Sequence, residues 1–447
     1  MSSINSFSQT TVSSIISSNQ TWTAAGSPYM VTGNVLIESG VKITIEPGTK
    51  IKTTGGLLRI IVDGTLEAIG KKDSVIVADS VAFEFTSKCV GYDVSTGNGS
   101  QFQYVLFRGA DNPGVKTIDL KGKSMLVKNC KFLEAYYYIY AYSNTGDTTD
   151  LIVSNTVFQG SGYSSGYMVY CSGNVRLQIS DCYADNIGGI IVGKWTTIKK
   201  STFKNFSYSS GIRQTSGLEL ILECNLFQNF RYTILDLSYP NANSIIEVRE
   251  NTFDTSDVLV RMRGGASYTP KKLEIKNNNF LHYNTNSIQV SIGSNPGVAD
   301  TLNLTKNYWG TSTKADIELG IKDFLDDITI AGYIDFSTYL TSQVKTCSKG
   351  GTIGGADTSG INTGIKTMNK QLISVFPNPA NTQLNIEADG KLIQSIRILD
   401  LKGQTQIIEI YKTTSPQVDV SNLIDGIYFI EVSGDDFVSR NKLIVKH

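Results

Sequence analysis

The sequence predicts an all-β protein, in which a right-handed parallel β-helix solenoid is followed by a small antiparallel β-sandwich. One hexapeptide pattern recurs nine times between Phe102 and Trp309: an apolar residue, two variable residues, a small polar residue, a variable residue and, in all copies but one, an aromatic. After a stretch rich in Gly, Ser and Thr, the chain from 371 to 447 instead alternates short apolar strands with turn residues.

The composition narrows the class of partner. The 447 residues include 40 basic and 40 acidic side chains, so the formal net charge is zero. A balanced charge lacks the basic surface that binds nucleic acid, and we expect no nucleic acid partner. Only two His are present, one of them the last residue. This argues against a His triad and a multi-His metal site, so we expect no metal and no cofactor.

Residues 1–21 form an N-terminal segment without Lys or Arg and without a continuous apolar run. The segment therefore lacks the charged and hydrophobic regions of a signal peptide. Because the C-terminus described below indicates export, we expect that a signal peptide was removed from this sequence. No stretch approaches 18 consecutive apolar residues, so we expect no integral membrane segment.

Residues 22–340 are expected to form the β-helix with a C-terminal cap. Apolar residues alternate with other residues in the segment that leads into each hexapeptide. The copies start at Phe102, Val127, Val153, Ile179, Ile198, Leu222, Val248, Ile275 and Leu304. Alternation indicates strands with one buried face, and the usual distance between copies suffices for three short strands and three turns. The apolar residues Ile317, Ile321 and Phe324 recur with helical spacing, so we expect a short helix over the last coil.

The small polar position of the hexapeptide predicts a structural ladder inside the solenoid. Its residues are Cys130, Thr156, Cys182 and Ser201, followed by Asn225, Asn251, Asn278 and Asn307. Stacked Asn side chains can hydrogen-bond from coil to coil in a buried turn. Cys130 and Cys182 lie two coils apart, too far for a disulfide, so we expect them to be packing residues.

The opening and closing coils resemble those of pectin-lyase-like β-helix surface proteins. The resemblance rests on Gly33 to Gly70, which includes GNVLIESGVKITIEPGT and VDGTLEAIG, and on NYWG at 307–310. It implies the β-helix fold over about residues 22–340 and leaves the activity open.

Residues 341–370 are rich in Gly, Ser and Thr without strand alternation, which predicts a flexible linker. Residues 371–447 contain short strands separated by turns such as Asp400 to Gly403, as expected of a small antiparallel sandwich. From the residues alone this module is an adhesin-like domain, a binding domain or a signal.

Four blocks of this module resemble the type A sorting domain of the type IX secretion system: VFPNPA at 375–380, IRILDLKG at 396–403, LIDGIYFI at 423–430 and KLIVK at 442–446. The resemblance implies a Bacteroidetes protein moved across the outer membrane, then secreted or held at the cell surface. It implies that residues 371–447 bind the outer-membrane secretion machinery. The matching signal residues are Pro377, Asn378, Pro379, Gly403, Gly426, Tyr428, Lys442 and Val445.

The coils contain no recognisable catalytic motif. The pectin-hydrolase pattern needs paired Asp residues and Gly-His-Gly, whereas His282 has no neighbouring Gly. Strand alternation turns some polar side chains outward along one face. We therefore expect Arg213, Asp236 and Arg261 as weak catalytic candidates and Tyr138, Tyr140 and Arg263 as ligand-binding candidates.

Three functional hypotheses remain at this point. The favoured one is an exported, non-catalytic β-helix protein that binds glycans. The alternative is a polysaccharide lyase or glycoside hydrolase acting on a groove along the β-helix. A purely structural adhesin is the third.

Overall fold

The computed structural model describes residues 9–345 and 374–447 apart from short internal gaps. The gaps are 57, 111–113, 144–145, 161–165, 207–209, 215–216, 239–241, 265–269, 284–287, 293–299, 329–331, 389–391, 401–404 and 434–437. The chain divides into two compact units, residues 1–361 and 362–447. Most of the predicted linker over 341–370 lies outside the described residues.

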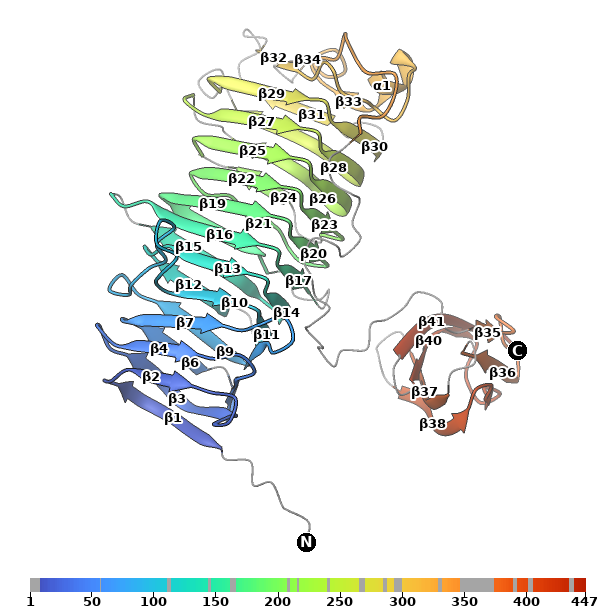
Figure 1. Cartoon of the computed structure of the whole chain (residues 1–447). Helices are drawn as coiled ribbons and strands as arrows, with labels where there is room; N and C mark the ends of the chain where they lie inside the picture. The colour runs from blue at the N-terminus through green and yellow to red at the C-terminus, as the bar shows by residue number, and fades with distance from the viewer. Residues whose placement is uncertain are drawn as a thin grey trace. The chain divides into compact units, whose positions relative to one another are not determined.

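The first unit is a parallel β-helix, confirming the predicted fold class (Figure 1). Its coils run along three faces. Face 1 is an 11-stranded parallel sheet. Its strands are β2 (Gln20–Trp22), β4 (Lys42–Ile45), β7 (Thr65–Ile69), β10 (Gln101–Gln103), β13 (Met125–Lys128), β16 (Thr149–Ser154), β19 (Val175–Ser180), β22 (Trp195–Lys199), β25 (Glu219–Glu223), β27 (Ile245–Arg249) and β29 (Lys272–Lys276).

Faces 2 and 3 belong to a 21-stranded sheet that bends around the other two sides. Face 2 contains β5 (Lys50–Thr53), β8 (Ile76–Asp79), β11 (Val105–Ala110), β14 (Lys131–Ala135), β17 (Val157–Gln159), β20 (Tyr183–Asp185), β23 (Thr202–Lys204) and β30 (Asn279–Tyr283). Face 3 contains β6 (Leu58–Val62), β9 (Val81–Phe85), β12 (Lys116–Lys121), β15 (Tyr137–Ser143), β18 (Val169–Gly173), β21 (Ile190–Ile191), β24 (Ser210–Gln214), β31 (Ile288–Ile292) and β33 (Ile321–Lys322). The strands that run across both faces are β1 (Thr10–Ile16), β3 (Tyr29–Ile37), β26 (Leu226–Ser238) and β28 (Thr252–Gly264).

The solenoid begins earlier than predicted. Strand β1 lies within residues 1–21, which the sequence assigned to a separate N-terminal segment, and it pairs in parallel with β3. Val12 and Ile16 are buried in the core. The hexapeptide pattern does not extend to β1, so the apolar residues that place it in the first coil carried no repeat signal.

From Cys182 to Asn307, each ladder residue is hydrogen-bonded to the next one along the solenoid. The Oδ1 of Asn251 accepts from both the backbone N–H and the Nδ2 of Asn225, each at 2.9 Å. Asn278 serves Asn251 in the same way at 3.0 Å, and Asn307 serves Asn278 at 2.9 and 3.0 Å. All four Asn side chains are fully buried. In the earlier coils a hydroxyl takes this role, since Ser201 Oγ accepts from the Cys182 N–H.

A residue with positive φ precedes each ladder position, for example Cys224 (60°), Glu250 (58°) and Asn277 (57°). Left-handed backbone costs a residue other than Gly about 1 kcal/mol. The ladder offsets this cost because the side chain that follows the turn satisfies the backbone donors of the neighbouring coil. The turn and the ladder therefore form one repeated corner between faces 1 and 2.

The aromatic position fills the interior. Phe132 lies between Phe107 and Phe158, with ring centroids 4.5 and 4.8 Å away and nearly parallel planes. A second run of stacked rings starts at Phe203 and continues through Phe227 and Phe253. All these rings are buried. The stack is interrupted at Ala184, where the hexapeptide lacks its aromatic.

The end of the solenoid carries the short helix α1 (Lys314–Leu319), together with the paired strands β32 (Asp300–Asn303) and β34 (Gly332–Asp335). Ile317, the buried residue of this helix, packs into the hydrophobic core of the solenoid. The predicted helix was too long, because the chain leaves the helix at Gly320 and Ile321 starts β33. Among the described residues, no helix has the length and hydropathy to cross a membrane.

The second unit is a small antiparallel sandwich, as predicted. One sheet contains β35 (Ser374–Phe376), β36 (Gln383–Glu387) and β39 (Gln417–Asp419). The other contains β38 (Thr405–Thr413), β37 (Ile393–Leu399), β40 (Gly426–Ser433) and β41 (Val438–Val445). Both sheets contribute to one core, with Leu384 from the first and Ile398 and Ile430 from the second.

Candidate functional site

The outer side of face 3 carries one register-aligned residue from each coil, which we name the central row. Parallel, in-register strands place its members about 4.8 Å apart along the solenoid axis. From β9 to β28 the row consists of Glu84, Asp119, Tyr140, Tyr170, Ile191, Arg213, Asp236 and Arg261.

The structure brings the three weak catalytic candidates together in this row. Asp236 is fully buried, and its Oδ2 lies 2.7 Å from the Nη2 of Arg261, whose side chain is 24% exposed. Arg213 is half-buried, and within the described part of the chain it makes no ion pair. Asp236 is therefore held as a buried ion pair and is not presented to solvent.

One ligand-binding candidate does not face the surface. Tyr138 is 1% exposed and packs its ring against Phe132 and Phe158, 6.0 and 5.7 Å away. The prediction was wrong because Tyr138 and Ile139 both point inward where the chain turns from face 2 into face 3, which breaks strict alternation. Arg263 lies in β28, in register with Ser238, and its side chain is outside the described residues.

Tyr140 does face outward, and it belongs to a group that we name the tyrosine cluster. Tyr140 and Tyr170 stack with centroids 4.9 Å apart and planes 7° apart, and Tyr137 and Tyr167 stack at 5.9 Å. Tyr142, at 41% exposure, lies on the same strand as Tyr140. Tyr170 could have been found from the sequence, since it stands one coil after Tyr140. It was missed because the number of residues between the two differs from the usual distance between coils.

A lysine covers one end of the stack. The Nζ of Lys116 lies 3.6 Å from the centroid of the Tyr140 ring and 3.2 Å from Asp119 Oδ2. Burial, and then the neighbouring Tyr170 and Asp119, raise the pKa of Tyr140 above its ordinary value. The Tyr140 hydroxyl therefore stays protonated through the neutral range and can donate a hydrogen bond.

Two surface pockets lie where face 3 turns into face 1. One, of about 290 Å³, is lined by Lys121, Tyr142 and Asp147. The other, of about 310 Å³, is lined by Tyr170, Ile191 and Lys194. Both pockets therefore adjoin the tyrosine cluster.

The second pocket lies at the shortest coil of the solenoid. The hexapeptides that start at Ile179 and Ile198 are closer together than any other neighbouring pair, and this coil gives face 3 only the short strand β21. A missing stretch of strand leaves a depression between the neighbouring coils. Gly173 (φ 76°) turns the chain at its rim, where an added Cβ would lie 1.9 Å from the carbonyl oxygen of Ser143.

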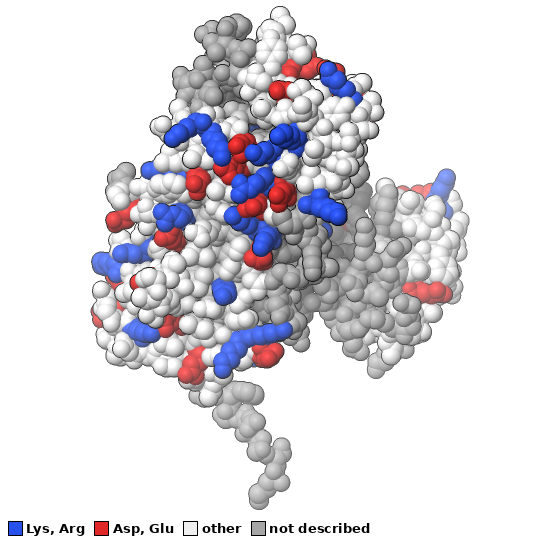
Figure 2. Space-filling model, turned by 45° about the horizontal axis from the view of Figure 1, so that its top comes forward, with Lys and Arg blue, Asp and Glu red and all other residues white. Residues whose placement is uncertain are grey.

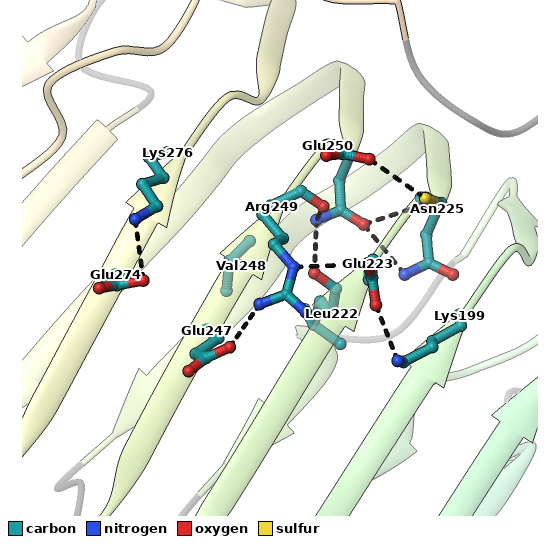
Figure 3. Close-up of polar contacts among 12 residues, drawn as sticks. Lys199, Leu222, Glu223, Asn225, Glu247, Val248, Arg249, Glu250, Glu274 and Lys276 are labelled. Atoms are coloured by element: carbon teal, nitrogen blue, oxygen red, sulfur yellow. Dashed lines mark hydrogen bonds and ion pairs between the residues drawn. The ribbon is translucent and has the colours of Figure 1, made fainter.

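Face 1 carries a network of ion pairs (Figure 3). Glu223 contacts Lys199 at 2.8 Å and Arg249 at 3.4 Å, and Arg249 also contacts Glu247. Lys272 continues the network from Glu247, at 2.6 Å, to Glu274. Figure 2 shows acidic and basic side chains side by side on the visible surface. Their mutual neutralisation favours a structural role for this face.

Metal binding finds no support in the described ranges. No group of three or more His, Cys, Asp or Glu side chains lies together there. Cys89, Cys130, Cys171 and Cys182 are free and buried. Cys224 is disulfide-bonded, and its partner lies outside the described residues.

The C-terminal unit joins the first and last blocks of the predicted sorting signal. Asn378 Oδ1 accepts from the Ile444 N–H at 2.9 Å, 66 residues away, and Ala380 forms a parallel bridge with Val445. The first block includes Pro377 and Pro379, whose peptide bonds are both cis.

The remaining signal residues lie mainly on β40 and β41. Gly426 pairs with Val445, which is buried, and the Tyr428 hydroxyl donates to the Ile424 carbonyl at 2.8 Å. Lys442 pairs with Phe429 through the backbone, and its side chain is outside the described residues. Gly403 also lies outside them.

Fold and C-terminal module together define a β-helix protein with a separate terminal sandwich. Residues 374–446 match the family of the secretion system C-terminal sorting domain. The protein is therefore a β-helix protein with a type IX sorting domain, exported across the outer membrane to the cell surface or beyond, and that domain interacts with the secretion machinery. A comparison with curated proteins found no match.

Proposed function

We propose that the exported β-helix is a non-catalytic protein that binds polysaccharide through face 3. The observation that carries the proposal is the tyrosine cluster, in which five tyrosines from two adjacent coils share one outer surface. Aromatic rings supply a large, rigid contact area with a polar hydroxyl at the end, which suits the mixed apolar and polar surface of a sugar.

The surroundings of the cluster support an extended ligand. Strands at about 4.8 Å spacing repeat at nearly the length of one sugar residue, so a chain running along the axis can meet one coil per residue. The two pockets, of about 290 and 310 Å³, are lined by Tyr142 and Tyr170, which belong to adjacent coils of the cluster. Their polar lining, including Lys121 and Lys194, offers hydrogen bonds to hydroxyl groups.

The test compares Tyr142→Ala with the matched control Tyr232→Ala in the full chain. Tyr142 and Tyr232 are 41% and 40% exposed, but Tyr232 lies on β26 outside the cluster. On a glycan array followed by titration, we expect saturable binding that Tyr142→Ala weakens about tenfold, because tyrosines are enriched among the minority of contacts whose truncation costs over 1 kcal/mol. Absence of saturable binding would contradict the proposal and leave a structural adhesin. Equal weakening by both variants would contradict the tyrosine cluster as the binding surface.

The alternative of a lyase or hydrolase rests on Arg213, Asp236 and Arg261 sharing the central row. The burial of Asp236 and its ion pair with Arg261 weigh against it, since a general acid or base must reach the substrate. We expect Asp236→Ala to lower stability by about 3–5 kcal/mol, as breaking a buried pair does, and the double change Asp236→Leu with Arg261→Met to restore most of it.

Thermal unfolding of both variants measures this difference. Incubation of the wild type with acidic polysaccharides, followed by detection of unsaturated or reducing sugar ends, tests the catalytic alternative directly. Sugar ends that Asp236→Asn abolishes in a folded protein would establish the enzyme and overturn the non-catalytic proposal.

A further inference from the structure

The inference concerns the depression at the short coil, which we name the slot. The slot lies over Ile191, whose register neighbours in the central row are Tyr170 in the preceding coil and Arg213 in the following coil. Tyr170 and Ile191 also line the pocket of about 310 Å³.

Among the described residues, the Tyr170 ring has one stacked neighbour, Tyr140, and its contacts with Tyr137 and Tyr167 are edge-to-face. The Tyr140 ring lies between Lys116 Nζ, at 3.6 Å, and the Tyr170 ring, at 4.9 Å with nearly parallel planes. One face of Tyr170 is therefore covered by Tyr140. Its opposite face points to the next coil, where the register partner is Ile191. Because Ile is short and branched at Cβ, it cannot cover the outer half of a Tyr ring.

The width of the slot suits a single ring. Tyr170 and Arg213 stand two coils apart, which corresponds to about 9–10 Å. Subtracting the thickness of their own atoms, about 3.5 Å, leaves roughly 6 Å between the facing surfaces. A sugar ring inserted there contacts Tyr170 on one side and the guanidinium on the other, and so occupies the position that a long side chain takes in neighbouring coils.

Two cations, Arg213 and Lys194, border the slot, and the carboxylate that follows Arg213 in the row, Asp236, is paired with Arg261 at 2.7 Å. In the described part of the chain, neither Arg213 nor Lys194 makes an ion pair, and the buried Nε of Arg213 has no hydrogen-bond partner. Lys194 Nζ donates to Asn174 Oδ1 at 2.9 Å and lies 5.0 Å from the centroid of the Trp195 ring, and both partners are uncharged. Other cations of the same surface are already neutralised, such as Lys116 by Asp119.

From these observations we propose that the slot binds a negatively charged sugar residue, with its ring on Tyr170 and its carboxylate or sulfate on Arg213 and Lys194. The inference rests on the proposed glycan binding and adds the site and the charge of the ligand. Guanidinium groups bind carboxylates and sulfates through charge-assisted hydrogen bonds, which makes the charge a determinant of affinity.

The experiment uses the full chain and two matched pairs of probes in calorimetric titrations. One pair is a uronic acid hexasaccharide and its carboxyl-reduced, neutral form. The other is sulfated maltohexaose and maltohexaose. We expect the charged member of at least one pair to bind about tenfold more tightly or better, since a hydrogen bond to a charged group contributes that much. The pair that shows the preference identifies the carboxylate or the sulfate.

Three variants locate the site. Arg213→Gln should abolish the preference for charge, whereas the control Arg176→Gln, which removes an arginine paired with Asp150 on face 1, should keep it. Ile191→Tyr should fill the slot, continue the ring stack and abolish binding of the charged probes in a folded protein.

The outcomes separate the two proposals. Equal binding of charged and neutral probes, an unchanged preference in Arg213→Gln, or full binding by folded Ile191→Tyr would each overturn the slot while leaving glycan binding by face 3 intact. Failure of all four probes and of the glycan array would overturn both. Circular dichroism of each variant verifies that a lost affinity does not come from unfolding.

Discussion

At the scale of single residues, the asparagine ladder is the most demanding feature of the solenoid. Asn251 and Asn278 each connect three coils, because the Nδ2 donates to carbonyls of its own and the preceding coil and to the Oδ1 of the next ladder Asn, while the Oδ1 accepts from the ladder residue before it. Asn251, for instance, donates to the carbonyls of Leu222 and Arg249 and to Asn278. A buried amide with all its partners stabilises, whereas a missing one leaves several donors unsatisfied.

Asn251→Ala is therefore expected to lower the free energy of unfolding by about 2–4 kcal/mol. It leaves the backbone N–H of Asn225 without an acceptor and removes one of the two acceptors of the Asn225 Nδ2, which keeps the Ile198 carbonyl. Thermal unfolding monitored by circular dichroism measures the loss. The control is Asn98→Ala, because Asn98 lies in an exposed turn. Equal melting temperatures for both variants would show that the ladder contributes nothing specific.

At the scale of the strands, the same periodic chain presents two different outer surfaces. Face 3 collects tyrosines because β15 and β18 place Tyr140 and Tyr170 at equivalent positions. Face 1 collects opposite charges because Lys199, Glu223 and Arg249 are register neighbours. In both cases each coil contributes one residue at the same register position. Because these residues are neighbours along the axis, they form an extended surface.

The charge network of face 1 gives a pH prediction. Hydrogen bonds from Lys199 and Arg249 lower the pKa of Glu223, and those from Lys272 and Arg249 lower that of Glu247. A carboxylate whose pKa is lowered by folding stabilises the protein above the pKa of the unfolded chain, and this stabilisation disappears as the pH falls through the folded value.

We therefore expect the melting temperature to decrease as the pH is lowered below about 4.5, which is the ordinary Glu pKa from which both groups are shifted. Glu247→Gln should lower the melting temperature by about 1–2 °C at pH 7 and by less at pH 3, as expected for partly exposed pairs. Scanning calorimetry across this range measures both. An effect of Glu247→Gln that is undiminished at pH 3 would mean that the side chain acts through packing, and Glu318→Gln on the exposed surface of α1 serves as the control.

At the scale of the whole molecule, the chain combines a long solenoid with a small terminal sandwich that directs export. The sandwich has its own core, and its first and last blocks meet through Asn378 and Ile444. A signal built from both ends of a folded unit depends on the complete domain. Export and the proposed glycan binding are thereby assigned to separate units.

Deleting residues 371–447 is expected to leave the protein in the periplasm of its native host. Cell fractionation and accessibility to added protease measure its position. Fusing residues 371–447 to an unrelated periplasmic protein is the complementary control and should bring that protein to the surface. Surface exposure of the truncated chain would contradict the role of the sorting domain.

The fold of this protein could be predicted from local spacing in its sequence, and its destination from the resemblance of its C-terminal blocks to a sorting domain. Positions repeated once per coil, such as Asn251 and Phe253, and the blocks around Pro377 and Tyr428 are signals of this kind. A stacked fold repeats its local rules in every coil, so the spacing of the hexapeptides was sufficient to place the ladder and the core aromatics.

The surface site, in contrast, depends on how the chain folds. Tyr138 was assigned outward by strict alternation, but the corner between faces 2 and 3 turns it into the core. The shortest coil brings Tyr170 and Arg213 to either side of Ile191. The sequence shows that this coil is short, but only the structure shows that the missing residues shorten its strand on face 3. Corners and coil lengths set these positions, because orientation at a turn and register between coils are properties of the folded chain and not of the repeat.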